Sequence, residues 1–162
     1  MTIAEIMKKM IDYSEGNTHD INHFMMVWGY ARTIGKFENL SDEMQFLVET
    51  AAIVHDIACP LCREKYGTTV APYQEIEGIP LAGEFLKDTG MTEEQIERVK
   101  FIVGHHHTFD CIDGIDFQIL VEADYIVNAI ENGCSSGNIR KFTEKYFVTD
   151  SGKHIVRSLF GI

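Results

Sequence analysis

The sequence lacks most of the features that divide a chain into domains or direct it to a membrane. It has three prolines and no Ser- or Pro-rich linker among its 162 residues, so we expect a single domain, residues 1–162, with one hydrophobic core. No apolar run approaches the roughly 20 residues of a membrane span, and the N-terminus has no signal-peptide layout. These absences predict a cytoplasmic protein without a membrane partner.

Positive charge is also scarce. The chain has 14 Lys and Arg residues against 25 Asp and Glu residues, which gives a formal net charge of -11. Because such a chain repels a phosphate backbone, we expect no nucleic-acid polymer as a partner. A small anionic substrate could still bind where a metal ion supplies positive charge. The composition gives no indication of the oligomeric state.

Four cysteines occur, and only Cys59 and Cys62 have a suggestive spacing, C-x-x-C. Such a pair is redox-active in some proteins and forms half of a zinc site in others. The second half of a zinc site is missing, because Cys111 and Cys134 are isolated. We therefore interpret the thiols as structural, although an exposed pair could form a disulfide under oxidising conditions.

Apolar residues recur at helical spacing along most of the chain, and no segment shows the alternation of a β-strand. Ser41 is predicted as an N-cap, and Thr92 with Gln95 as a capping box. Residues 59–72 have no clean period and are expected to form a loop with one helical turn. The predicted fold is all-α, a compact array of about six to eight helices. The expected helices are 2–14, about 20–37, one that begins after Ser41 and stops before Pro60, one from Pro72 to Thr89, one from Thr92 into the three consecutive histidines, 116–131, 138–147 and 150–160.

A histidine and an aspartate stand side by side at the end of the apolar run Ala51–Ala58. Counting back from His55 at helical spacing reaches Ala52 and Ala51, so the imidazole lies on the face expected to meet the core, with Asp56 about 100° further round. A buried carboxylate is costly unless it is paired or bound to a cation. One metal ion would satisfy both side chains.

Other helices also direct an ionisable side chain inward, namely His23, Asp124, and either His105 or His106. Taken alone, each is explained more simply as structural, because a core histidine commonly bonds to a carbonyl. Together, several imidazoles and two carboxylates in apolar surroundings need a shared cation. Mixed His and Asp ligands suit a divalent transition ion and leave positions open for water, which is typical of a catalytic site.

The order His23, His55 with Asp56, and Asp124 resembles the HD-domain superfamily of metal-dependent phosphohydrolases, over roughly residues 18–130. The context matches as well, since Ile-Val precedes the His-Asp pair and the last aspartate lies deep in a late helix. The resemblance implies an HD-domain-like, all-helical fold with a metal held by these four side chains. It also implies hydrolysis of a phosphate ester, usually of a nucleotide or a related small phosphorylated metabolite.

One position departs from the pattern of the members that bind two metals. Where they have a histidine at the start of the fourth helix, this sequence has Gln74, and a neutral amide is a poor ligand for a transition metal. We therefore expect one tightly bound ion of Mn, Fe, Co, Ni or Zn and at most a weak second one. Gln74 becomes a candidate substrate contact. His105 or His106 would contact the substrate or an activated water, and His107 is expected outside the site.

The reaction predicted from this resemblance is attack of a metal-activated water on the ester. Asp56 would be a metal ligand and would also orient or deprotonate the water, while His105 or His106 would stabilise the transition state or protonate the leaving oxygen. Arg63 and Lys65 are candidates to hold a distal phosphate.

Two other functions stay open at this point. A non-catalytic sensor domain would bind a metal or a nucleotide and signal through a partner, and the altered position at Gln74 favours it. An iron oxygenase is favoured less, because it needs the histidine that Gln74 replaces. A purely structural helical protein would bind no metal.

Overall fold

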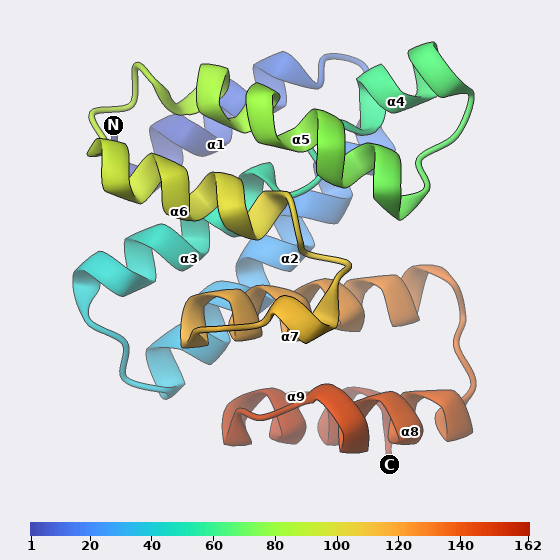
Figure 1. Cartoon of the computed structure of the whole chain (residues 1–162). Helices are drawn as coiled ribbons and strands as arrows, with labels where there is room; N and C mark the ends of the chain where they lie inside the picture. Colours follow the sequence, from blue (N-terminus) through green and yellow to red (C-terminus); the bar gives the residue numbers. More distant parts are fainter.

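The amphipathic segments of the sequence form helices that make up the whole architecture. A computed structural model describes residues 1–162 as nine α-helices and one 3₁₀ turn, without a strand (Figure 1). The all-α prediction is confirmed. The elements are α1 Ile3–Tyr13, α2 Thr18–Phe37, α3 Asp42–Val54, α4 Cys59–Tyr66, α5 Ala71–Leu86, α6 Glu93–Val103, η1 Phe109–Cys111, α7 Ile115–Glu131, α8 Ser136–Tyr146 and α9 Asp150–Phe160.

Helix ends follow the local sequence signals. The Ser41 side chain accepts a hydrogen bond from the Met44 amide and caps α3. Thr92 and Gln95 form the expected capping box at the start of α6. These interactions satisfy amide groups that the first turn of each helix would otherwise leave unpaired.

The segment after Asp56 is more regular than predicted. Residues 59–66 form α4, so the prediction of a loop was wrong for them. Pro60 lies in the first turn of α4, where its missing N–H costs nothing and its fixed φ suits a helix. Gly67 ends the helix in the left-handed region, with φ 69°. Eight residues are too few for an apolar period to show clearly in the sequence.

The centre of the fold consists of α2, α3 and α7. Helix α2 packs against both of the others, α3 also packs against α7, and α5 pairs with α6. In Figure 1, α8 and α9 lie on the far side of α7 from α4, α5 and α6. A cluster of 32 buried apolar residues runs through this arrangement. Side chains on the inner faces of α2, α3 and α7 can therefore meet.

The continuous stretch Asp42–Tyr66, which includes α3 and α4, is long and apolar enough to cross a membrane by length and composition alone. In the fold, 78% of its most apolar window is buried among the other helices. The apolar character of this stretch is therefore that of a core helix.

The C-x-x-C pair is not exposed. Cys59 is 5% exposed and Cys62 is 0% exposed, and all four cysteines are unpaired. Burial raises the pKa of both thiols, which disfavours the reactive thiolate. The expectation of an exposed pair was wrong because both residues lie on the inner side of α4, and the structural interpretation of the thiols agrees with this burial.

Candidate metal centre

Four side chains from α2, α3 with its following turn, and α7 meet in the interior, namely His23, His55, Asp56 and Asp124. The Nε2 atom of His23 lies 3.3 Å from His55 Nε2 and 3.2 Å from Asp124 Oδ1. The Oδ2 atom of Asp56 lies 3.5 Å from His23 Nε2 and 3.7 Å from His55 Nε2. The structure thus brings together all four residues that were predicted to hold the metal.

Hydrogen bonds at the far ring nitrogens show which atoms of the histidines face this centre. The Nδ1 atom of His55 lies 2.9 Å from Ala52 O, and Nδ1 of His106 lies 2.8 Å from Val103 O. A carbonyl oxygen only accepts, so Nδ1 of each ring carries the hydrogen. In the neutral imidazole, Nε2 then presents a lone pair to the centre.

The third imidazole is oriented in the same way by a carboxylate. His23 Nδ1 lies 3.0 Å from Glu131 Oε2, and this N–H···carboxylate contact leaves Nε2 of His23 pointing at Asp124. A hydrogen-bond acceptor at the outer nitrogen of a metal-binding histidine fixes the ring and makes the inner nitrogen a better ligand.

Unless a proton sits on one of the imidazoles, the converging atoms are all acceptors, so they need a proton or a metal ion between them. The Nε2 atom of His106 is buried without a hydrogen-bond partner, although it lies 3.4 Å from Asp56 Oδ1. The Nε2 atoms of His23 and His55 also face the carboxylates of Asp56 and Asp124. Imidazole nitrogens combined with carboxylate oxygens are a ligand set for a divalent transition ion. The residues present therefore fit such an ion.

The same proximity shifts the pKa values of the cluster. Burial lowers the pKa of His23, but the hydrogen bond to Asp124 and the charges of Asp56 and Asp124 outweigh burial and raise it to about 9. Burial acts to raise the pKa of both aspartates, but the neighbouring histidines outweigh it and hold them below their usual range. In the metal-free protein, a protonated His23 therefore compensates the two carboxylates.

Metal binding is expected to displace the proton on His23. Because the pKa of this imidazole is about 9 in the metal-free protein, metal affinity should rise with pH from 6 toward 9, by up to about tenfold per pH unit for each proton displaced. Calorimetric titration with Mn²⁺ in buffers of different ionisation enthalpy measures this release, which should be about one proton at pH 7.5. Binding without proton release would contradict the prediction.

The turn after α6 supplies a second group of possible ligands. Asp56, His106 and His107 have donor atoms within 4.8 Å of one another. Asp56 is thus shared, because it also belongs to the group that contains His23 and His55.

The positions of the three consecutive histidines differ in part from those expected. His106 faces Asp56, whereas His105 turns away, with Nδ1 2.7 Å from Phe101 O and its ring stacked on Phe101. His107, which was expected outside the site, lines the cavity described below. The reason is that α6 ends at Val103 and the following residues form a turn, so helical counting no longer applies.

A polar cavity of about 260 Å³ opens onto the centre. It is lined by 13 residues, of which one, Cys59, is hydrophobic. His23, Asp56 and Asp124 are part of its wall, whereas His106 is not. A ligand in this cavity would thus reach the predicted metal ligands from the side of α2, α4 and α7.

Two of the three predicted substrate contacts lie in this cavity. Arg63 lines it and forms an ion pair with Asp20 of α2. Gln74 also lines it. Lys65 does not, because its ammonium group lies 2.6 Å from Glu77 Oε1 in a surface ion pair. The structure therefore does not bring Lys65 to the site.

Two side chains that contact the predicted ligands were missed in the sequence. Glu131 contacts His23, and Asn128 Nδ2 donates to Asp124 Oδ1 at 2.8 Å. Asp124, Asn128 and Glu131 stand at i, i+4 and i+7, so they share one face of α7. Extending the inward face of that helix by two turns would have found both.

Replacing Glu131 with glutamine is expected to weaken metal binding by about tenfold, because the carboxamide accepts the His23 Nδ1 hydrogen less strongly than the carboxylate does. Calorimetry or competition with a chelator would measure the affinity. Glu144→Gln, which makes the same charge change on an exposed residue of α8, is the control. Equal affinities of the two variants would show that Glu131 does not support the ligand.

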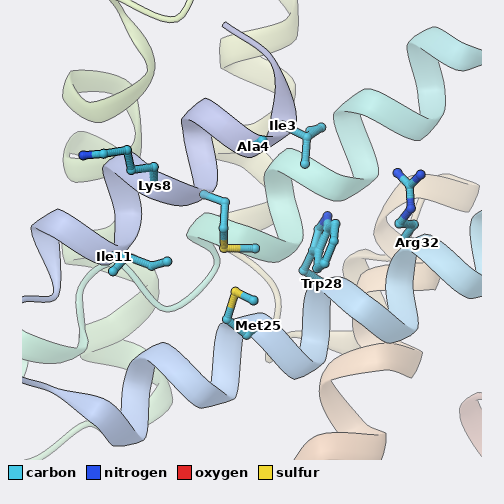
Figure 2. Close-up of a pocket in the computed structure, with 8 residues that line it drawn as sticks. Ile3, Ala4, Lys8, Ile11, Met25, Trp28 and Arg32 are labelled. Carbon is cyan, nitrogen blue, oxygen red and sulfur yellow. The ribbon is translucent and has the colours of Figure 1, made fainter.

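A larger cavity of about 490 Å³ lies between α1 and α2 (Figure 2). Most of its lining is apolar, and its two cations have partners. Lys8 pairs with Asp12 at the surface, and Arg32 pairs with the buried Glu49, which also accepts from Trp28 Nε1 at 2.8 Å. This cavity offers no cluster of groups for metal binding or acid–base chemistry.

Comparison with known proteins agrees with this geometry. The family model described as HD domain matches residues 20–129, and no curated protein matches the chain. A crystal structure described as a predicted HD superfamily hydrolase from an uncultured Thermotogales bacterium superposes with a TM-score of 0.72 at 22% sequence identity. The alignment covers 98% of this chain and 84% of that chain, so the two proteins share the fold.

The matched segment makes up more than half of the chain. It contains all four converging residues, His23, His55, Asp56 and Asp124, in the order expected from the sequence. The chain belongs to the HD domain family.

Proposed function

We propose that this protein is a metal-dependent phosphohydrolase that cleaves a small phosphate ester. The observation that carries the proposal is the convergence of imidazole Nε2 atoms and two carboxylates at the end of a polar cavity. Membership of the HD domain family and the fold shared with a protein described as a hydrolase support it.

The chain's own residues have distinct places in this reaction. His23, His55, Asp56 and Asp124 would hold the ion. A divalent ion held there lowers the pKa of a water molecule and neutralises the charge that develops on the phosphoryl oxygens. The side chain of Asp56 is 23% exposed, against 0% for that of His55, so Asp56 is accessible from the cavity. We therefore assign to its carboxylate the roles of orienting the attacking water and accepting its proton.

The two histidines after α6 would act on either side of Asp56. His106 is buried, with Nε2 3.4 Å from Asp56 Oδ1, and would hold this carboxylate in place when a proton or an ion lies between the two atoms. His107 lies in the cavity wall, and burial together with the charge of His106 lowers its pKa to about 4. A neutral His107 can donate a hydrogen bond to a phosphoryl or leaving oxygen at pH 7.

The stoichiometry of one tightly bound ion remains our proposal. Gln74 lines the cavity, but it is not among the groups whose atoms could jointly hold a metal. The group formed by Asp56, His106 and His107 would provide a weaker second position. Metal analysis after dialysis should find about one equivalent, and two retained equivalents would overturn this part of the proposal.

The test is phosphate release from a panel of esters by protein loaded with Mn²⁺, Co²⁺ or Ni²⁺. We expect turnover that a chelator abolishes and added metal restores. Binding of metal and nucleotide without turnover of any ester would instead support a sensor. Turnover that needs iron and oxygen would support an oxygenase, and absence of any bound metal would reject all three functions.

A further inference from the structure

We propose, on the basis of the phosphohydrolase function above, that the substrate is a small hydroxyl-rich phosphomonoester, such as a sugar or polyol phosphate, and not a nucleotide. Four features of the cavity support this assignment: its size, the scarcity of hydrophobic residues in its wall, its charges and its carboxamides.

The cavity is small. Its volume of about 260 Å³ lies below the range of about 300–1,000 Å³ that is typical of pockets for drug-sized ligands. A phosphate with a short hydroxylated carbon chain is of this order, whereas a nucleotide also has to place a base.

The wall offers little apolar surface to a base, and its aromatic rings are the imidazoles of His19, His23 and His107. Bases are held in proteins mainly by stacking on aromatic side chains and by apolar surface, and Cys59 is the one hydrophobic residue in the lining. On the neighbouring helices α4 and α5, Tyr66 and Tyr73 are stacked on each other, with ring centroids 4.0 Å apart. Neither of these two tyrosines lines the cavity.

The charges of the wall suit a single phosphate. Arg63 is the one Lys or Arg residue in the lining, and it is already paired with Asp20. After Asp20, Glu131 is the second carboxylate in the wall that is not a predicted metal ligand. A chain of several phosphates would meet net repulsion here, because tight binding of phosphates needs free cations. With one phosphate at the metal centre, the rest of the cavity can hold the uncharged part of the substrate.

Three residues with carboxamides line the cavity and can contact this uncharged part, namely Gln74, Asn128 and Asn132. Carboxamides donate and accept hydrogen bonds, as hydroxyl groups do. Gln74 is 7% exposed, its Nε2 donates to Thr69 O, and its Oε1 is buried without a partner. A buried acceptor without a donor is costly, and a substrate hydroxyl would supply that donor. Gln74 would thus determine specificity for hydroxylated substrates.

The experiment compares kcat/KM of the Mn²⁺-loaded protein for ribose 5-phosphate, glycerol 3-phosphate, AMP, ATP and phenyl phosphate. We expect at least about tenfold higher values for the two hydroxylated phosphates than for the nucleotides. Calorimetry with non-hydrolysable phosphonate analogues of ribose 5-phosphate and AMP measures binding independently of turnover, and the sugar analogue should bind more tightly.

A variant identifies the role of Gln74. Gln74→Met keeps the length of the side chain and removes both its acceptor and the Nε2 donor to Thr69 O. It should lower kcat/KM about tenfold for ribose 5-phosphate, which would lose a hydrogen bond to a buried group. The value for phenyl phosphate, which has no hydroxyl, should change less than twofold. Asn138→Ala, which removes a carboxamide on α8 outside the cavity, is the control.

The outcomes separate this proposal from the one on which it rests. Preference for AMP or ATP in both turnover and binding would overturn the substrate class and leave the phosphohydrolase function intact. Tighter binding of the sugar phosphonate without hydrolysis of any ester would support the cavity assignment and reject the enzymatic function. Equal losses of Gln74→Met on ribose 5-phosphate and phenyl phosphate would overturn the specificity role of Gln74.

Discussion

Asp56→Ala is expected to lose bound metal and ester hydrolysis together, with kcat/KM reduced by roughly a thousandfold or more, which corresponds to about 4 kcal/mol of transition-state stabilisation. Asp56 belongs to both groups of possible metal ligands and is accessible from the cavity. Its removal would therefore take away a ligand and the proton acceptor at once. It would also leave the imidazoles of His23 and His106 without their shared carboxylate.

Metal content by elemental analysis and phosphate release on the same preparation would measure this effect. Asp88→Ala changes an exposed aspartate and should leave both quantities unchanged. His55→Ala should also lose metal and activity together, because its Nε2 points into the centre and its side chain is fully buried. Full activity of either site variant in metal-free buffer would reject the proposed mechanism.

Most helices could be predicted from the sequence because each has a buried face and a recognisable end. The capping residues Ser41 and Thr92 and the apolar stripes are local features that survive folding unchanged. The exception was α4, whose eight residues form a helix between the turn after Asp56 and Gly67. Cys59 and Cys62 are buried on its inner side, but two such positions in eight residues do not show as a period in the sequence.

The four converging residues could be predicted because each breaks an apolar stripe with a group that is costly to bury. The residues around them could not all be found in this way. His107 was misplaced because helical geometry was extended beyond Val103, where α6 ends. Arg63 and Lys65 have the same charge and lie two residues apart in the sequence. Only the fold shows that Asp20 draws one toward the cavity and Glu77 holds the other outside it.

The carboxylate of Glu122 shows that a buried charge on α7 does not by itself indicate a metal. Glu122 is 0% exposed, yet four hydrogen bonds satisfy it. Its Oε1 accepts from Gln118 Nε2 at 2.8 Å, from the Val148 amide at 2.7 Å and from the Thr149 amide at 3.0 Å, while Oε2 accepts from the Thr149 hydroxyl. The three donors on Val148 and Thr149 fasten α7 to the connection between α8 and α9. At Asp124 and Asp56 the neighbours are mainly imidazoles, which is why those sites fit a cation and Glu122 does not.

Glu122→Ala is accordingly expected to lower the free energy of unfolding by about 3–4 kcal/mol, because four donors lose their acceptor and several of them stay buried. Urea denaturation would measure the loss, with Glu144→Ala on the exposed face of α8 as a control that should stay within about 0.5 kcal/mol.

Burial raises the pKa of Glu122 from 4.5, so the folded protein holds this proton more tightly than the unfolded chain. Its contribution to stability therefore falls as pH rises from 4.5 through the folded pKa, and Glu122→Gln should remove that dependence. Folded Glu122→Ala should still bind metal, since residues 122 and 124 point about 200° apart around α7. An unchanged urea midpoint would show that the hydrogen bonds from Val148 and Thr149 to Glu122 do not hold α8 and α9 in place.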